Sequence, residues 1–235
     1  METIVLSLGG SIIVPDKPDY FFLREFKNFI LTNLNRYSFI IVCGGGKTNF
    51  YYNEAAKRIS DVSKNDLDLI GIMATKLNAE LVRSIFGGYA YPKIITSPNS
   101  IVFKNFYKDN FKKNNKTKVF VASGWKPGNS SDYVSVLIAK NLRCKRIFNL
   151  TNVDYVYDKD PRMNKDAKKI VSISWNDFRK MFSSEWQPRM NSPFDPIASK
   201  EAQKHKLKVF ILKGTDLKNL QNAFENKDFV GTTIY

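Results

Sequence analysis

The chain has 235 residues, enough for one large α/β domain or two closely joined lobes, and contains no run of about eighteen apolar residues that would cross a membrane. Its 37 basic and 22 acidic side chains give a formal net charge of +15, which favours anionic partners such as nucleotides. Much of this excess is lysine mixed with asparagine, as in residues 112–118, which is more typical of a solvated loop than of a nucleic-acid-binding patch. The sequence therefore gives little support for a membrane or a nucleic-acid partner.

The first apolar run and the cysteines indicate the cellular compartment. Ile4 to Leu8 reads as a strand, with no basic leader or small-residue cleavage site before it, so we expect a cytoplasmic protein. Cys43 and Cys144 each lie in an apolar strand-like run, which is typical of buried reduced thiols rather than of a disulfide or a metal pair. No dedicated metal site made of protein side chains is predicted.

The first predicted strand, Ile4 to Leu8, ends in the run Gly9-Gly10-Ser11. Ligands collect at the carboxyl ends of strands in open α/β sheets, so this glycine turn is a candidate binding loop. Apolar residues at helical spacing between Phe22 and Leu34 then predict an amphipathic helix that faces the core.

A second glycine loop, Gly44-Gly45-Gly46-Lys47, follows the strand Phe39 to Val42 and opens a helix predicted over Thr48 to Ile59. Glycines between a strand and a helix expose backbone N–H groups at the positive end of the helix dipole, where phosphate binds. Lys47 adds a point charge that can reach a phosphate oxygen. A strand-to-helix turn that binds nothing has the same pattern, so this loop alone does not decide between the two interpretations.

A long helix is predicted from Asp66 to Phe86, with Gly87-Gly88 ending it. Asp68 near its start fits two roles: an acid favoured by the helix dipole, or a carboxylate that accepts hydrogen bonds from ribose hydroxyls. A short strand is predicted over Lys93 to Thr96, and residues 100–112 are predicted as an aromatic, basic helix or loop.

The loop after the predicted strand Val119 to Ala122 combines small residues, hydroxyls, a cation and a carboxylate. Its candidate binding residues are Trp125, Lys126, Pro127, Gly128, Asn129, Ser130, Ser131 and Asp132. The last three are also natural N-cap residues for a helix predicted over Tyr133 to Asn141, so a capping role and a binding role both remain open.

The predicted strand Lys145 to Leu150 leads into a loop, residues 151–161, that is rich in polar side chains and carries two tyrosines able to flank a planar base. The later predicted elements are helices over residues 175–182, 196–206 and 216–224, strands over 208–212 and 231–234, and an irregular connection over 186–193. Strands that alternate with helices predict an α/β fold, a three-layer α/β/α sandwich with a mainly parallel central sheet.

Several loops share their order and spacing with one known family. They are Gly9-Gly10-Ser11 with Val14-Pro15, Gly44-Gly45-Gly46-Lys47, Asp68 to Ile72 with Asn78-Ala79, Pro127-Gly128 with Ser130-Ser131-Asp132, Thr151-Asn152-Val153-Asp154 with Val156-Tyr157 and Asp160-Pro161, Asp195-Pro196, and Gly231 to Ile234. With these loops the chain resembles the amino-acid kinase superfamily, and within it the archaeal-type uridylate (UMP) kinases, over essentially its whole length.

The resemblance implies a single amino-acid kinase domain over residues 1–235, with an acceptor-binding N-lobe at 1–142 and an ATP-binding C-lobe at 143–235. The implied reaction, a step of pyrimidine biosynthesis, transfers the γ-phosphoryl group of ATP to the 5′-phosphate of UMP. Because this acceptor is already an anion, the reaction needs alignment and charge neutralisation, including Mg²⁺, rather than a general base. Similar proteins are often hexamers built from dimers, so a homo-oligomer is expected.

The site residues implied by the resemblance fall into three groups. Those for UMP are Gly45 at the phosphate, Asp68 at the ribose hydroxyls, and Trp125, Lys126, Pro127, Gly128, Asn129, Ser130 and Ser131 at the rest. Those for ATP are Gly10, Ser11 and Gly46 at the phosphates, and Thr151, Asn152, Tyr157 and Asp160 at the nucleoside. The catalytic pair is Asp132, which would order lysines or Mg²⁺ at the transferring group, and Lys47.

Four positions depart from the family pattern. Ser7 stands where many members have a lysine, which archaeal-type UMP kinases often lack; Phe50 and Lys76 replace common arginines; Tyr155 replaces a usual glycine. Lysine lacks the bidentate fork of arginine, so these departures concern acceptor identity and turnover rather than fold.

Two alternatives remain. One is a kinase of the same fold for another phosphorylated acceptor, such as isopentenyl phosphate; that subfamily uses a histidine near the acceptor, and the single histidine here, His205, lies in a late amphipathic helix. The other is a non-catalytic nucleotide-binding regulator. The polar residues kept in the loop after Val119 to Ala122 and in the loop over residues 151–161 argue against this alternative.

Overall fold

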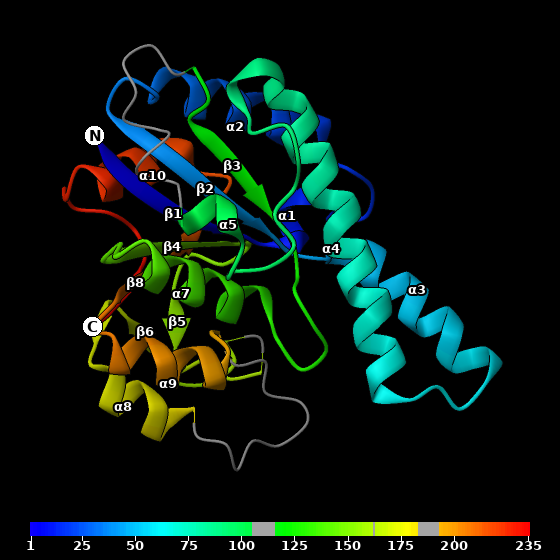
Figure 1. Ribbon diagram of the computed structural model, residues 1–235. Helices are drawn as coiled ribbons and strands as arrows, with labels where there is room; N and C mark the ends of the chain where they lie inside the picture. The colour runs from blue at the N-terminus through cyan, green and yellow to red at the C-terminus, as the bar shows by residue number, and fades with distance from the viewer. Residues whose placement is uncertain (105–115, 162, 183–192) are drawn as a thin grey trace.

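The computed structural model describes residues 1–104, 116–161, 163–182 and 193–235 (Figure 1). Its central sheet has seven strands in the order β3-β2-β1-β4-β8-β9-β7. These strands are β1 (Glu2–Leu8), β2 (Tyr37–Cys43), β3 (Val119–Ala122), β4 (Arg146–Thr151), β7 (Ser172–Ile173), β8 (Lys208–Lys213) and β9 (Thr232–Ile234). Only the β8–β9 pair is antiparallel among the paired strands of this sheet, so the predicted mainly parallel sheet is confirmed.

Helices cover both faces of the sheet, which gives the predicted three layers. The described helices are α1 (Gly10–Ile13), α2 (Tyr20–Thr32), α3 (Gly46–Ile59), α4 (Lys64–Phe86), α5 (Ile101–Lys104), α7 (Ser131–Asn141), α8 (Trp175–Met181), α9 (Pro196–Lys204) and α10 (Leu217–Phe224), with a 3-10 turn at Gly87–Tyr89. Helices α2, α4 and α10 contribute buried residues to one hydrophobic cluster, and α7, α8 and α9 contribute to a second.

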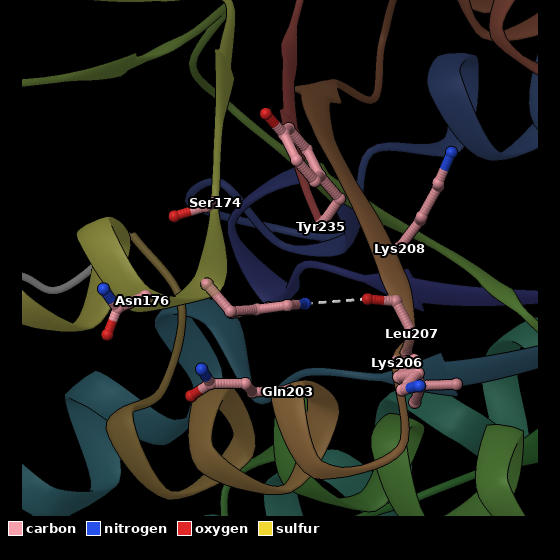
Figure 2. Close-up of a pocket in the computed structure, with 8 residues that line it drawn as sticks. Ser174, Asn176, Gln203, Lys206, Leu207, Lys208 and Tyr235 are labelled. Carbon is pink, nitrogen blue, oxygen red and sulfur yellow. Dashed lines mark hydrogen bonds between the residues drawn. The ribbon is translucent and has the colours of Figure 1, made fainter.

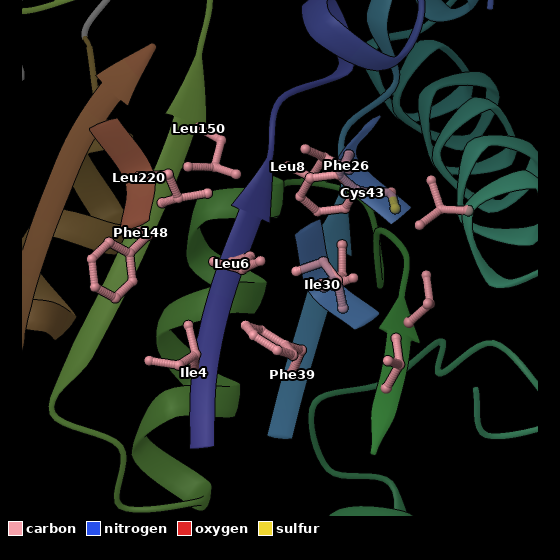
Figure 3. Packing of buried hydrophobic residues seen from close by; sticks show 14 of the residues in the cluster. Ile4, Leu6, Leu8, Phe26, Ile30, Phe39, Cys43, Phe148, Leu150 and Leu220 are labelled. Carbon is pink, nitrogen blue, oxygen red and sulfur yellow. The ribbon is translucent and has the colours of Figure 1, made fainter. Parts of the chain in front are cut away.

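Strand β1 lies inside the sheet, between β2 and β4, and is buried on both faces. Ile4, Leu6 and Leu8 point into the cluster that contains Phe26 of α2, as Figure 3 shows. Val5 belongs to the cluster on the opposite face. A strand buried on both faces is the expected central element of a parallel sheet.

The structure departs from the sequence predictions in a few short segments. The strand predicted over Lys93 to Thr96 is reduced to an isolated bridge between Ile95 and Ala122. The glycine turn after β1 begins the short helix α1. A two-stranded antiparallel sheet of β5 (Val156–Tyr157) and β6 (Lys169–Ile170), and the short β7, were not predicted. The predicted irregular connection lies almost wholly outside the described residues, as do residues 105–112 of the segment predicted over 100–112.

Helices α3 and α4 form a pair that extends beyond the edge of the sheet (Figure 1). No residue of α3 is buried, in contrast to the other long helices. Within the described ranges, no helix combines the length and the apolar character that crossing a bilayer requires.

Candidate active site

Four loops meet at one edge of the sheet because the strands before them are parallel and in register. Leu8 of β1 pairs with Cys43 of β2 and with Leu150 of β4, so the loops after these three strands begin at the same level. Ala122 at the end of β3 pairs with Val42, which places the fourth loop beside them. This is the edge where open α/β sheets bind ligands.

The two glycine loops are in direct contact. A Cβ atom on Gly10 would collide with the backbone nitrogen of Gly46, and a Cβ atom on Gly46 would collide with the carbonyl oxygen of Gly10. Gly46 also has a φ of +59°, a conformation that side chains disfavour. Glycine is therefore required at both positions for the loops to approach one another.

Backbone hydrogen bonds determine which N–H groups of the second glycine loop can bind an anion. Gly44 donates to the carbonyl of Leu8 at 3.0 Å, and Lys47 donates to the carbonyl of Val14 at 3.1 Å. The first N–H groups of a helix have no acceptor within the helix, so those of Gly45 and Gly46, at the start of α3, are the donors suited to phosphate.

The side chain of Lys47 lies against aromatic rings of α3. Its Nζ is 4.4 Å from the ring centre of Phe50 and 5.7 Å from that of Tyr51. The hydroxyl of Tyr51 in turn donates to the Asp16 carboxylate at 2.8 Å. The predicted phosphate-binding lysine thus contacts Phe50, one of the positions expected to depart from the family pattern.

The loop after β3 approaches α4. The backbone N–H of Gly128 donates to Oδ2 of Asp68 at 2.8 Å, so the structure brings together two residues predicted to contact the acceptor nucleotide. Lys126 Nζ lies 4.3 Å from the ring centre of Trp125. Oδ1 of Asn129 is buried and has no hydrogen-bond donor among the described residues, which leaves an acceptor for a ligand.

Of the possible N-cap residues in this loop, Ser130 has the capping geometry. Its hydroxyl accepts a hydrogen bond from the N–H of Tyr133 at 3.1 Å, and Ser131 begins α7. The capping interpretation therefore holds for Ser130 and leaves Asp132 for another role.

Asp132 points from the first turn of α7 toward β1. Its Oδ1 accepts a hydrogen bond from the Ser7 hydroxyl at 3.2 Å, and its Oδ2 accepts one from the N–H of Asp195 at 3.3 Å. Burial of the carboxylate raises its pKa to about 6, against the lowering effect of these two donors. None of the ion pairs between described residues includes Asp132, so a bound cation would find an uncompensated negative charge here.

The predicted nucleoside side of ATP lies beyond β4. Thr151 ends this strand, and its hydroxyl accepts a hydrogen bond from the N–H of Val153 at 2.9 Å, which shapes the turn through Asn152. Tyr157 is in β5, and the Asp160 carbonyl accepts a hydrogen bond from the N–H of Asn164 at 2.9 Å. These four predicted residues lie within ten residues of one another, from the end of β4 to just beyond β5.

Comparison with known proteins identifies the family of the chain. The sequence matches the family described as "Amino acid kinase family" over residues 2–213. The chain belongs to the amino acid kinase family. It is 31% identical over 233 residues to a uridylate kinase of Pyrococcus abyssi, covering 98% of each chain, and 33% identical over 234 residues to one of Thermoplasma volcanium, covering 99% of this chain and 97% of that one.

Solved structures of uridylate kinases share the fold of this amino acid kinase. The crystal structure of uridylate kinase from Archaeoglobus fulgidus matches with a TM-score of 0.81 and 29% identity, covering 100% of both chains. The UMP kinase of Ureaplasma parvum matches with a TM-score of 0.76 at 19% identity, which supports the shared fold. The family resemblance and the fold class inferred from the sequence are both confirmed.

Figure 2 shows a pocket of this amino acid kinase that is distinct from the glycine loops. It has a volume of about 340 Å³ and is lined by Ser174, Trp175, Asn176, Gln203, Lys206, Leu207, Lys208 and Tyr235. Lys208 begins β8 and pairs with Arg146, the first residue of β4, so the pocket lies at the amino ends of these strands. It is therefore at the opposite edge of the sheet from the candidate active site.

The sequence-based site left out three residues of this kinase that the structure places in it. Asp195 donates its N–H to Asp132, while Asn78 and Thr75 of α4 bond to the backbone of the loops after β2 and β3. Asn78 and Asp195 stand in segments that carry the family resemblance, which could have indicated them. Nothing in the sequence around Thr75 distinguishes it from any other helical threonine.

Proposed function

We propose that this protein is a UMP kinase, which transfers the γ-phosphoryl group of ATP to the 5′-phosphate of UMP and produces UDP and ADP. The observation that carries the proposal is the contact between Gly10 and Gly46. Direct transfer between two phosphates requires the donor and acceptor phosphate sites to adjoin, and this contact joins the two glycine loops. The near full-length similarity to uridylate kinases supports UMP as the acceptor.

In this mechanism the loop backbones hold the two polyanions. The N–H groups of Gly45 and Gly46 would bind the UMP phosphate and the adjoining ATP phosphate, while Gly10 and Ser11 would line the ATP phosphates from β1. The acceptor oxygen is already negatively charged, so no side chain has to remove a proton from it. Alignment and charge neutralisation remain as the tasks of the protein.

Asp132 suits the requirements of Mg²⁺, which neutralises charge on the phosphates of ATP when it is bound. The described residues contain no cluster of three or more metal-ligating side chains. Mg²⁺ commonly binds through one or two carboxylates together with substrate phosphates. The carboxylate of Asp132, which forms no ion pair with another described residue, fits this mode better than it would fit a metal caged by protein. Asp132 would hold the ion or order a lysine such as Lys47 at the transferring group.

The remaining roles follow the two halves of the chain. Residues 1–142 would bind UMP, with Asp68 at the ribose and the segment Trp125 to Ser131 at the rest of the nucleotide. This segment includes Oδ1 of Asn129, which has no donor among the described residues. Residues 143–235 would bind the nucleoside of ATP through the loop after β4, whose two tyrosines, Tyr155 and Tyr157, could flank a planar base. The Nζ of Lys169 lies 5.0 Å from the ring centre of Tyr155.

We also expect a homo-oligomer, by resemblance a hexamer built from dimers. The exposed apolar side chains of α3 and α4 support association, because large exposed apolar surfaces are uncommon on monomers. The most exposed are Ile59 at 84%, Tyr52 at 68%, Leu77 at 64% and Met73 at 61%. Light scattering coupled to gel filtration would measure the assembly. The cytoplasmic location stays a prediction from the sequence.

The direct test is ADP production from MgATP with UMP, CMP, dTMP and isopentenyl phosphate offered separately. Turnover with UMP alone is the expected result. Isopentenyl phosphate is disfavoured because His205 ends α9 next to the start of β8, at the edge of the sheet opposite to the glycine loops. Nucleotide binding without turnover on any acceptor would instead indicate a non-catalytic regulator.

A further inference from the structure

Helix α4 carries three polar side chains that bond to glycine backbone groups of both acceptor loops. They are Asp68, Thr75 and Asn78, whose spacings of seven and three residues keep them on one face of the helix. Asp68 and Thr75 contact the loop after β3, and Asn78 contacts the loop after β2. One rigid element therefore connects the two loops.

Asn78 is almost fully buried, with 2% of its surface exposed. Its Nδ2 donates hydrogen bonds to the carbonyl oxygens of Gly44, at 2.8 Å, and Gly45, at 3.0 Å. In a planar trans peptide, the N–H group points opposite to the carbonyl of the preceding residue. By holding these two carbonyls toward α4, Asn78 therefore directs the N–H groups of Gly45 and Gly46 away from it.

Thr75 connects the second loop to the same helix. Its hydroxyl donates to the carbonyl of Ile72 at 2.7 Å and accepts from the N–H of Gly124 at 2.8 Å. A Cβ atom on Gly124 would lie 2.8 Å from this hydroxyl oxygen, so the close approach depends on glycine. Gly124 precedes the segment proposed to contact the nucleoside, and its anchoring fixes where that segment begins.

We propose that Asn78 and Thr75 are positioning residues for phosphoryl transfer, with separate effects on the two parts of the acceptor. Asn78 sets the direction of the N–H groups that bind the acceptor phosphate, and Thr75 sets the position of the loop that binds its nucleoside. This inference rests on the proposed UMP kinase function, because it assigns the two loops to the two parts of UMP.

The test for Asn78 compares the affinities of UMP and uridine, measured by calorimetry, since their ratio reports the phosphate contacts. We expect the wild-type protein to prefer UMP, and Asn78→Ala to reduce that preference by roughly tenfold to a hundredfold while uridine affinity is unchanged. Asn78→Ser, whose hydroxyl is too short to reach both carbonyls, should act in the same way and serves if the alanine variant does not fold.

The matched control is Asn219→Ala. Asn219 is another buried asparagine that bonds to backbone, with Nδ2 donating to the Val230 carbonyl at 2.7 Å and Oδ1 accepting from the Val230 N–H at 2.7 Å, between α10 and β9. The Asn219→Ala variant should lose stability as the Asn78 variants do, but it should keep the preference for UMP over uridine. An unchanged preference in both Asn78 variants, or an equal loss in the control, would overturn the proposal. A wild-type protein that does not prefer UMP would contradict the proposed function itself.

Thr75 is tested with the shape-conserving variant Thr75→Val and the hydroxyl-conserving variant Thr75→Ser. We expect the valine variant to weaken UMP and uridine equally, by about tenfold, and to raise the KM for UMP with little change in kcat. The serine variant should behave like wild type because it keeps the acceptor for Gly124. Equal behaviour of the two variants would show that the hydroxyl does not position the loop.

Discussion

The hydroxyl of Ser7 donates a hydrogen bond to Oδ1 of Asp132 at 3.2 Å and joins the central strand to the first turn of α7. By the family resemblance Ser7 takes the place of a lysine found in many members, which would leave a neutral donor beside this carboxylate. No described cation pairs with Asp132, so its protonation depends on burial, on two hydrogen-bond donors and on the charge of Asp195. Activity and stability should therefore both respond to pH through this residue.

Asp132→Asn should lower kcat by about a hundredfold or more, because the variant loses the charge proposed to order the cations at the transferring group. The wild-type kcat should fall as the pH drops through about 6, the pKa of the folded carboxyl group. Residual activity of the variant should lack this pH dependence. Initial rates between pH 5 and 8 measure both effects, and an unchanged kcat would remove Asp132 from the site.

Although Asp132→Asn should lower activity, it should not lower the free energy of unfolding at neutral pH. The pKa of Asp132 is raised on folding, from an ordinary value of about 3.9, so the folded protein binds the proton more tightly than the unfolded chain does. The ionised carboxylate therefore costs stability above pH 6, and this cost disappears as the pH falls below about 4. Urea unfolding should find the Asn variant equal to or more stable than wild type at pH 7.5, with the difference shrinking between pH 6 and 4.

Ser7→Ala should move the acidic limb of the kcat profile to higher pH. The hydrogen bond from Ser7 lowers the pKa of Asp132, so its removal leaves the effect of burial less opposed. Ser38→Ala is the control, since Ser38 is equally buried but pairs with Thr3 near the other end of β1. A profile that shifts in neither variant would mean that Asp132 does not determine the limb.

Asp68→Ala should raise the KM for UMP by about tenfold with a smaller change in kcat, because it removes both a proposed ribose acceptor and the acceptor for the Gly128 N–H. Asp66→Ala is the control on the same helix: Asp66 accepts a hydrogen bond from Ser63 at 2.6 Å and does not reach the loop. Steady-state kinetics with varied UMP separate the two variants. Equal KM values would refute the role at the ribose.

Gly46→Ala should destabilise the protein by about 2 kcal/mol or more and abolish most activity. The added Cβ would meet the Gly10 carbonyl in a backbone conformation that alanine disfavours. Gly88→Ala is the control, because a Cβ there has open space around it. In Gly46→Ala both the free energy of unfolding, measured with denaturant, and the turnover should fall. In Gly88→Ala neither should change.

Phe50→Arg should lower the KM for UMP several-fold. Phe50 is 49% exposed and lies under Lys47, so an arginine can be accommodated, can offer a bidentate fork to phosphate, and releases the lysine from the ring. Tyr52→Arg adds the same charge to the same helix at a position that is 68% exposed, and controls for general electrostatic attraction. A similar gain in both variants would assign the effect to net charge.

Local patterns determined most of the fold. The apolar run Ile4 to Leu8 could only form a buried strand, and glycines after it and after Val42 could be recognised because they end strands abruptly. The short strands β5, β6 and β7 were not predicted from the sequence, because two residues are too few for an alternating pattern. The segment Lys93 to Thr96 has strand-like residues, yet it lies between Pro92 and Pro98 and forms a single bridge to β3.

The sequence by itself thus determined the order of the elements, the glycine loops and the family, because each depends on residues close together in the chain. Only the tertiary structure decided which side chains complete the site. Ser7 and Asp132 are 125 residues apart, and Asn78 is 34 residues from Gly44. A hydrogen bond between distant residues depends on how strands register and helices pack, and no local pattern encodes that geometry.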